Sequence, residues 1–216
     1  MQTETTCSND RQEDMIAIVD YDAGNINSVE KAVRHLGFPC VTTRDADEIK
    51  NASALILPGV GAFGAAMGNL EKYDLVDPVK DYIGSGRPFL GICLGLQLLY
   101  EESEEDPGVK GLGILSGSIK RIPQKDGLKV PNIGWNSLDL SGDGRLFAGI
   151  PDGAFVYFVH SYYLSATDRD TVKASIDYGT RIDASVEKDN IFACQFHPEK
   201  SSATGLRILQ NFLETA

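Results

Sequence analysis

Short, uninterrupted apolar runs alternate with amphipathic segments through the first half of the chain. The predicted strands are 15–20, 41–43, 54–57 and 89–92, and the predicted helices are 26–36, 65–70 and 75–83. A strand that is apolar along its whole length is typical of a parallel sheet, because helices cover both of its faces. The alternation therefore predicts an α/β fold with a mostly parallel central sheet and helices on both faces.

The second half of the chain differs, because strand-like segments follow one another with only Gly, Asp and Pro signals between them. These segments are 114–122, 136–140, 155–163, 172–176, 184–186 and 191–196, and a last helix is predicted over 203–213. We expect this half to extend the sheet and to add antiparallel strands. The chain has no internal repeat and no linker. Residues 15–216 are therefore predicted to form one domain, preceded by a disordered leader over 1–14.

Composition excludes several classes of function. The formal net charge of -11 argues against a nucleic-acid partner, whose phosphates require a basic surface. No apolar run approaches the roughly 18 residues of a membrane span, and the polar N-terminus lacks the pattern of a signal peptide. The four cysteines show no CxxC spacing, so we expect a reduced, cytoplasmic setting and no metal site.

The pentapeptide 91–95, Gly-Ile-Cys-Leu-Gly, joins the apolar run 89–92 to a helix-like segment at 96–102. A strand, a tight turn and a helix would place Cys93 on the bend, and the flanking glycines allow the sharp turn. Nucleophile elbows of hydrolases are built in this way, and a helix N-terminus favours thiolate. The alternative is a buried structural cysteine, the most frequent fate of a free thiol.

A nucleophilic cysteine needs a base, and three histidines are available. His35 lies near the end of a predicted helix and His160 lies inside a strand-like segment, whereas His197 follows a predicted strand. Pro198 favours an extended backbone at His197, in which residues two apart point to the same side, so Glu199 would orient the ring. With the elbow cysteine, these two residues are candidates for a catalytic triad. The alternative is an ordinary turn with an incidental His and Glu.

Both segments match a known family. The stretches 91–97 (GICLGLQ) and 195–199 (QFHPE) resemble the class I, triad-type glutamine amidotransferases. Within that family the chain is most similar to the glutaminase subunits of imidazole glycerol phosphate synthase, which serve histidine biosynthesis. The additional matching segments are 20–25 (DYDAGN), 58–63 (PGVGAF), 131–136 (PNIGWN), 157–162 (YFVHSY) and 196–201 (FHPEKS). They follow the family's order, and only the leader lies outside the resemblance.

Two positions bear on the subfamily. Asp22 stands where the family often has glycine. Aspartate tolerates a left-handed backbone better than most residues, so the turn is expected to survive. Leu96 stands where anthranilate- and aminobenzoate-type amidotransferases usually carry histidine, which favours the histidine-pathway branch.

The resemblance implies that Cys93 attacks the side-chain amide of L-glutamine and that His197 protonates the leaving ammonia, without a cofactor. Backbone N–H groups stabilise the oxyanion, and the resemblance assigns them to Leu94 and to the loop with Val60 and Gly61. The glycines of this loop make a peptide flip sterically cheap, so a partner-controlled switch is favoured over a plain turn. The residues implied to bind glutamine are Gly59, Gln97, His160, Ser161 and Tyr162.

The family passes ammonia through the interior of a TIM-barrel cyclase subunit, so the resemblance implies a heterodimer with an ammonia channel. The implied docking and gating residues are Asn25, Trp135, Asn136, Tyr157 and Lys200. Trp135 is the only tryptophan of the chain. An exposed position would suit an interface anchor, whereas core burial is the default for a lone tryptophan.

Two alternative functions share the triad: an amidotransferase subunit of another synthase, of the anthranilate or aminobenzoate type, and a free-standing γ-glutamyl hydrolase. A binding protein that has lost catalysis is a third, which the intact Cys93, His197 and Glu199 disfavour. Docking on a different acceptor enzyme would identify the first alternative, and strong glutaminase activity without a partner would identify the second.

Overall fold

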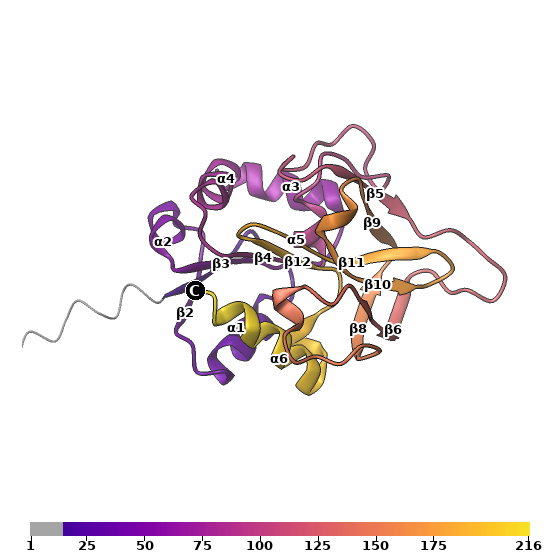
Figure 1. The fold of residues 1–216 in the computed structure, drawn as a ribbon. Helices are drawn as coiled ribbons and strands as arrows, with labels where there is room; N and C mark the ends of the chain where they lie inside the picture. Colours follow the sequence, from indigo (N-terminus) through magenta and orange to yellow (C-terminus); the bar gives the residue numbers. More distant parts are fainter. Residues whose placement is uncertain (1–14) are drawn as a thin grey trace, which may run out of the picture.

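The computed structural model describes residues 15–216 (Figure 1), so the predicted leader over 1–14 lies outside the described residues. The strands are β1 (Ile16–Val19), β2 (Cys40–Thr43), β3 (Ala54–Leu57), β4 (Phe89–Ile92), β5 (Gly117–Arg121), β6 (Asn132–Ser137), β7 (Asp139–Leu140), β8 (Phe155–His160), β9 (Tyr162–Ala166), β10 (Val172–Asp177), β11 (Arg181–Lys188) and β12 (Ile191–Cys194). The helices are α1 (Ile26–His35), α2 (Ala46–Asn51), α3 (Phe63–Lys72), α4 (Val76–Gly84), α5 (Leu94–Gln97) and α6 (Ser202–Leu213), and the short 3₁₀ turns are η1 (Arg145–Phe147), η2 (Arg169–Thr171) and η3 (Pro198–Lys200).

Neighbouring strands in the order β2-β1-β3-β4-β12 form the parallel part of a 10-stranded sheet. Every residue of β1, β3, β4 and β12 is buried, as a strand covered on both faces requires. The predicted α/β class with a parallel centre is therefore confirmed. The order of the strands changes direction between β1 and β3, which makes this point the topological switch of the sheet.

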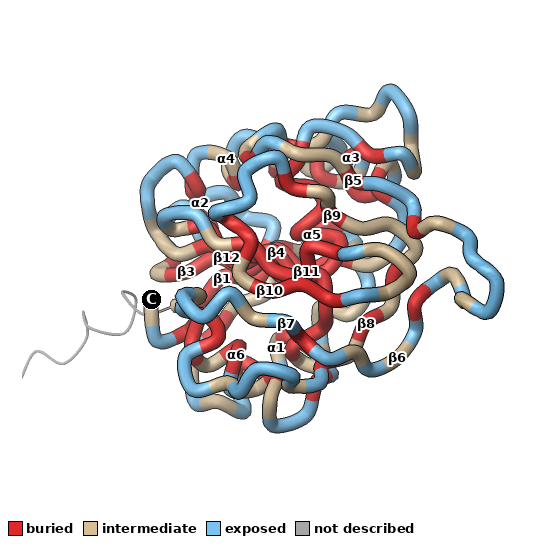
Figure 2. The backbone as a smooth tube through the Cα atoms, turned by 45° about the vertical axis from the view of Figure 1, so that its right-hand side comes forward, coloured by how far each residue is buried: buried red, intermediate tan, exposed pale blue. Residues whose placement is uncertain are grey.

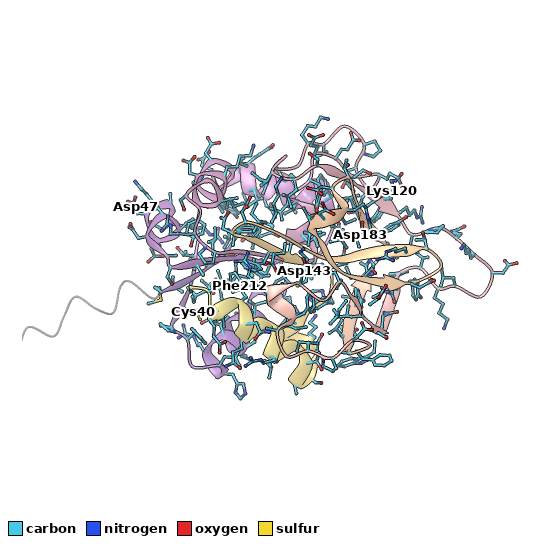
Figure 3. The ribbon with its side chains drawn as sticks, in the orientation of Figure 1. Cys40, Asp47, Lys120, Asp143, Asp183 and Phe212 are labelled. Atoms are coloured by element: carbon cyan, nitrogen blue, oxygen red, sulfur yellow. The ribbon has the colours of Figure 1, made fainter. Side chains whose placement is uncertain are left out.

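Helices cover the two faces of this sheet as two layers. α2, α3 and α4 pack on one face, and α1 and α6 pack on the other (Figure 1). Successive side chains of a strand enter opposite layers, so in β1 Ala17 faces the first layer and Ile18 the second. In the second layer, Phe212 of α6 (labelled in Figure 3) meets Phe192 of β12 edge to face, and their ring centroids are 5.6 Å apart.

The second half of the chain extends the sheet by antiparallel pairing, as predicted. β11 pairs with β12, β10 and β9, while β7 pairs with β10 and β5 pairs with β9. β6 and β8 form a separate two-stranded sheet. Buried strands fill the centre of the molecule, and exposed loops surround this half (Figure 2).

Some predicted elements are wrong because backbone pairing overrides the apolar pattern. The helix expected over 96–102 ends after one turn, since the N–H groups of 111–115 bond to the carbonyl groups of 98–101. The strand expected over 155–163 divides at Ser161, because β8 pairs with β6 whereas β9 pairs with β5 and β11.

The segment predicted as a single strand over 136–140 contributes to β6 and β7, which lie in different sheets. Helix α2 is absent from the prediction because six residues are too few to show a helical period. Within residues 15–216, no helix is long and apolar enough to cross a membrane. The same residues place no group of three or more His, Cys, Asp or Glu side chains where it could hold a metal ion.

Candidate active site

Four loops meet at one edge of the parallel sheet. They follow β1, β3, β4 and β12, which are consecutive neighbours in the sheet, so their carboxyl ends lie side by side. This edge includes the switch between β1 and β3, where open α/β sheets usually bind ligands. The loops are 20–25, 58–62, 93 and 195–197. The segments that the sequence singles out are therefore brought together by the fold.

Cys93 occupies the turn between β4 and α5 with φ 54° and ψ -106°, a backbone region that residues other than glycine rarely adopt. Its N–H donates to the Cys194 carbonyl at 2.7 Å, which ties the bend to β12. Both flanking glycines are required by space. A Cβ atom on Gly91 would lie 2.7 Å from the Gly95 oxygen, and one on Gly95 would lie 1.9 Å from the Leu57 oxygen. The structure thus has the sharp elbow that the glycines indicate.

His197 and Glu199 form a buried pair, with 2.8 Å between Nδ1 and Oε1. His197 has an extended backbone, with φ -100° and ψ 98°, as expected before proline. The segment that follows is the 3₁₀ turn η3, so the expectation that strand alternation places Glu199 beside the ring is wrong. The turn itself folds the carboxylate back onto the imidazole, and Ser201 Oγ holds it by donating to the His197 carbonyl at 2.6 Å.

The charged form of His197 is stabilised by its neighbours. Burial opposes the charge, but the Cys93 thiol and the Glu199 carboxylate outweigh it and raise the pKa of His197 to about 9. Within residues 15–216, Nε2 of His197 has no hydrogen bond of normal geometry, so the thiol acts on the ring through a looser contact. Because Glu199 occupies Nδ1, Nε2 is the nitrogen that can take a proton from the thiol.

The loop after β3 lies against the start of α5. The Leu94 N–H donates to the Gly59 carbonyl at 3.3 Å, so the protein itself occupies this candidate oxyanion donor. Tyr21, which is fully buried, donates its hydroxyl to the Pro58 carbonyl at 2.7 Å and anchors the start of the loop. Rotation of the peptide between Gly59 and Val60 would release the Leu94 N–H.

A cavity of about 370 Å³ opens beside Cys93, a volume at the lower end for ligand pockets and suited to a small metabolite. Its walls consist of Val60, Gly61, Cys93, Leu94, Gln97, Glu105, Pro131, Val159, His160, Ser161, Tyr162 and Lys200. Of the residues implied to bind glutamine, only Gly59 is absent from these walls. Its backbone is buried against Tyr21 and Leu94, where a Cβ atom would not fit.

The amide of Gln97 links the cavity wall to β9 and to the residue that follows β12. Its Nε2 donates to the Gln195 side-chain oxygen at 2.9 Å and to the Tyr162 carbonyl at 3.0 Å. Gln195 donates its own Nε2 to Cys93 Sγ at 3.6 Å. Both N–H groups of Gln97 are therefore used within the protein, and its oxygen is the group available to a ligand. Gln195 is part of the matched QFHPE segment, but only the structure shows its contact with the thiol.

His160 is a buried histidine of the cavity wall. Its Nδ1 lies 2.9 Å from the Tyr162 carbonyl, and its Nε2 lies 3.3 Å from Asn132 Nδ2. These partners assign the proton to Nδ1, because the carbonyl accepts and the Asn132 amide donates. Burial lowers the pKa of His160 to about 4, against the opposing effect of the Tyr162 carbonyl. The ring is therefore neutral at neutral pH.

His160 should make the protein sensitive to mild acid. Since its pKa falls on folding, the unfolded chain binds the proton more tightly, and stability is lost as the pH drops from about 6.5 toward 4. When the pH falls from 7 to 4.5, the unfolding free energy should decrease in both proteins. The decrease should be smaller in His160→Gln than in wild type, by roughly 2 to 3 kcal/mol. Urea unfolding at both pH values measures this difference, with His35→Gln, at an exposed histidine, as the control. Equal acid losses in wild type and His160→Gln would contradict the assignment.

Glu105 is a wall residue that the sequence does not single out. It belongs to the acidic run 101–106 (EESEED), which resembles a solvent-exposed segment. Its Oε2 accepts from the Phe63 N–H at 2.9 Å, and Asp106 Oδ2 accepts from the Gly64 N–H at 2.7 Å, so two carboxylates cap α3. Burial raises the pKa of Glu105, with the Phe63 N–H opposing and Asp106 adding to the shift. A carboxylate in this wall suits a ligand with an ammonium group.

The two-stranded sheet presents an apolar face to solvent. Trp135 is 49% exposed and meets Tyr157 edge to face, with ring centroids 6.0 Å apart. Ile133 and Phe155 lie on the same face and are also exposed. Core burial of Trp135 is therefore excluded, and an exposed apolar face of this kind could receive a partner.

The other predicted docking residues have different surroundings. Lys200 is exposed and lines the cavity. Asn136 is half-buried and donates to the Asn132 side-chain oxygen at 3.2 Å. Asn25 is turned inward, and its amide donates to Glu199 Oε1. Lys200 and Asn25 thus border the candidate site, whereas Asn136 is linked to it only through Asn132, which lies 3.3 Å from His160 Nε2.

The chain is similar to known proteins over most of its length. The family model described as Glutamine amidotransferase class-I matches residues 17–216. Imidazole glycerol phosphate synthase subunit HisH of Caldanaerobacter subterraneus subsp. tengcongensis is 50% identical over 200 residues, which cover 93% of this chain and 98% of the relative. The subunit of the same name from Aquifex aeolicus is 48% identical over 200 residues, covering 92% and 96%.

Solved structures show the same fold. One glutamine amidotransferase matches with a TM-score of 0.72 at 22% identity, covering 92% of this chain and 97% of that one. PurLQS from Thermotoga maritima matches with a TM-score of 0.72 at 20% identity, covering 94% and 98%.

Proposed function

The chain belongs to the class I glutamine amidotransferase family, and on this premise we propose that it is the glutaminase subunit of an imidazole glycerol phosphate synthase. In this role it hydrolyses glutamine to glutamate and ammonia in histidine biosynthesis. The observation that carries the proposal is the site itself. Cys93 stands on its elbow beside a cavity of about 370 Å³, and His197 and Glu199 are paired 2.8 Å apart.

The reaction begins when the Cys93 thiol gives its proton to His197 Nε2 and the sulfur attacks the side-chain amide carbon of glutamine. His197 then donates the proton to the leaving amine, so ammonia departs and a γ-glutamyl thioester remains on Cys93. Water deprotonated by His197 attacks the thioester, which releases glutamate and restores the thiol. Glu199 holds the ring at Nδ1 and supports its charged form, in keeping with the raised pKa of His197.

Glutamine binds with its α-ammonium group toward acceptors of the cavity wall. The Glu105 carboxylate and the Gln97 oxygen offer such acceptors. Ser161 and Tyr162 complete the opposite part of the cavity, where β8 gives way to β9.

The oxyanion donors are completed by a change in the loop 58–61. The Leu94 N–H donates to the Gly59 carbonyl, so in this conformation it is not available to a substrate oxyanion and the site is inactive. Rotation of the Gly59–Val60 peptide would free this N–H and turn the Val60 N–H toward the substrate oxygen. Gly61, at φ 107°, lets the backbone follow without a Cβ clash.

The partner that we propose is a TIM-barrel cyclase, docked on the apolar face of β6 and β8. Trp135 and Phe155 are exposed on this face, and Val159 belongs to the same face while lining the cavity. The cavity therefore opens at the edge of the docking surface. Ammonia released at Cys93 would pass through this opening into the partner instead of bulk water.

Glutamate release measured with and without the cyclase tests the proposal. The chain alone should hydrolyse glutamine slowly, and the cyclase with its nucleotide ligand should raise kcat by at least about tenfold. Full activity without a partner would instead identify a free-standing hydrolase. Stimulation by an anthranilate or aminobenzoate synthase, and not by the cyclase, would identify the subunit of another synthase.

A further inference from the structure

Asn25 contacts the carboxylate that orients His197. Its Nδ2 donates to Glu199 Oε1, although the two residues are 174 positions apart in the sequence. The same oxygen lies 2.8 Å from His197 Nδ1. The other carboxylate oxygen, Oε2, is buried and has no hydrogen-bond partner in the described part of the chain. Within residues 15–216, Glu199 therefore depends on two donors, His197 and Asn25.

The side chain of Asn25 gives up its usual interaction to reach Glu199. Asn25 is the N-cap residue of α1, and its carbonyl accepts from the N–H groups of Ser28 and Val29. An N-cap asparagine normally accepts with its side chain from the N–H of the second or third helical residue, here Asn27 or Ser28, but Asn25 makes no such bond. Its backbone, at φ 73°, lies in the left-handed region. The amide is thus directed away from its own helix and toward the buried carboxylate.

We propose that Asn25 is a positioning residue of the triad, whose amide holds the Glu199 carboxylate in the orientation in which it supports His197. The inference rests on the proposed function. In this role Asn25 does not touch the substrate. It affects the reaction only through Glu199 and His197.

The physical reason is the burial of the pair. A buried carboxylate has no water to replace a lost donor, so the loss of one of its two hydrogen bonds leaves it less firmly held against the ring. It then supports the imidazolium less well, and the His197 ring loses its proton at lower pH. The thiolate–imidazolium pair would consequently form over a narrower range of pH.

Few other charges act on this pair. The titratable groups around it are Cys93 at the elbow, Cys194 on β12, Tyr157 and His160 on β8, and Lys200 on η3. Burial keeps Cys194 protonated and His160 neutral near neutral pH. The first turns of α1 and α6, which pack against η3, carry no charged side chain. A change at Asn25 should therefore act on the interaction between His197 and Glu199, and not on another charged group.

Two substitutions change the amide of Asn25 but keep its left-handed backbone. They therefore distinguish the effect of the amide on Glu199 from an effect on the loop conformation. Asn25→Gly removes the side chain without strain at positive φ. In Asn25→Asp, the introduced group can donate to Glu199 while it is protonated, but it repels Glu199 once ionised. Asn27→Asp adds the same charge two residues away, at an exposed position of α1, and is the matched control.

Glutamate release is measured across pH 5.5 to 9.5 for the complex with saturating cyclase and nucleotide. Asn25→Gly should lower kcat by about 10- to 100-fold, leave KM for glutamine within about threefold, and move the basic limb down by roughly one pH unit. Asn25→Asp should stay within about threefold of wild type at pH 6 and fall at least about tenfold below it by pH 8. Asn27→Asp should keep the wild-type pH profile.

The inference is overturned if Asn25→Gly and Asn25→Asp lower kcat equally at every pH and keep the limbs of wild type, because the residue then serves only the loop. It is also overturned if both variants regain wild-type kcat at saturating cyclase, which would make Asn25 a docking residue alone. Should Asn25→Gly fail to fold, the pH dependence of Asn25→Asp decides. A wild-type complex without glutamine hydrolysis would refute the proposed function itself.

Discussion

Replacing Cys93 by alanine should abolish partner-stimulated glutamine hydrolysis, with kcat reduced by at least about 10³-fold. The thioester requires a sulfur nucleophile at the elbow, and His197 Nε2 has no hydrogen-bond partner among the described residues, so it is free to take the proton of the thiol. Cys194 cannot take its place, because burial holds its pKa well above the usual value and its side chain is fully enclosed. Glutamate release by the complex at saturating glutamine measures the loss.

Cys40→Ala is the matched control for this substitution. Cys40 is also buried, but it lies on β2, which β1 and β3 separate from β4 (Figure 3). The same loss of a thiol should therefore leave kcat at the wild-type value. Glutamine hydrolysis that persists in correctly folded Cys93→Ala, as judged by circular dichroism, would refute the nucleophile assignment.

Replacing Gly95 by alanine should damage both the fold and the site. The added Cβ would lie 1.9 Å from the Leu57 carbonyl oxygen, which is backbone of β3 and cannot move alone. Separating α5 from β3 should cost at least about 3 kcal/mol of unfolding free energy. It should also displace Cys93 and the loop 58–61, so kcat should fall by about 100-fold or more. Urea unfolding and glutamate release measure the two effects.

Gly68→Ala provides the comparison for that substitution. Gly68 lies inside α3, and nothing stands within 4 Å of the position of its Cβ. Alanine there should be neutral or stabilising by about 0.5 to 1 kcal/mol, because it favours the helix. If Gly95→Ala were as stable and as active as Gly68→Ala, close approach of the backbone at the elbow would not be required.

The parallel sheet and the elbow were predictable because their signals are local. Four-residue runs that are wholly apolar require cover on both faces, which a parallel sheet with helices provides. The glycines around Cys93 permit a close, sharp turn, and the proline after His197 restricts the backbone of His197, whatever the rest of the chain does. The structure has both features, the strained turn at Cys93 and the extended backbone at His197.

The wrong elements over 96–102 and 155–163 share one physical cause. An apolar pattern shows that a segment is buried, but it does not show which backbone groups pair with it. The segment 98–101 therefore resembles a helix, although its carbonyl groups accept from 111–115. Likewise, 155–163 resembles one strand, although its two halves pair with different sheets on either side of Ser161.

The sequence by itself determined the fold class, the elbow and the residues proposed as the triad, because each depends on residue types at close spacing. Only the tertiary structure decided which buried polar atoms meet. Glu105 becomes a wall of the cavity by capping α3, and Asn25 supports Glu199 from 174 positions away. Such contacts leave no period in the sequence, because the cost of an unpaired buried group arises only when the folded chain removes it from water.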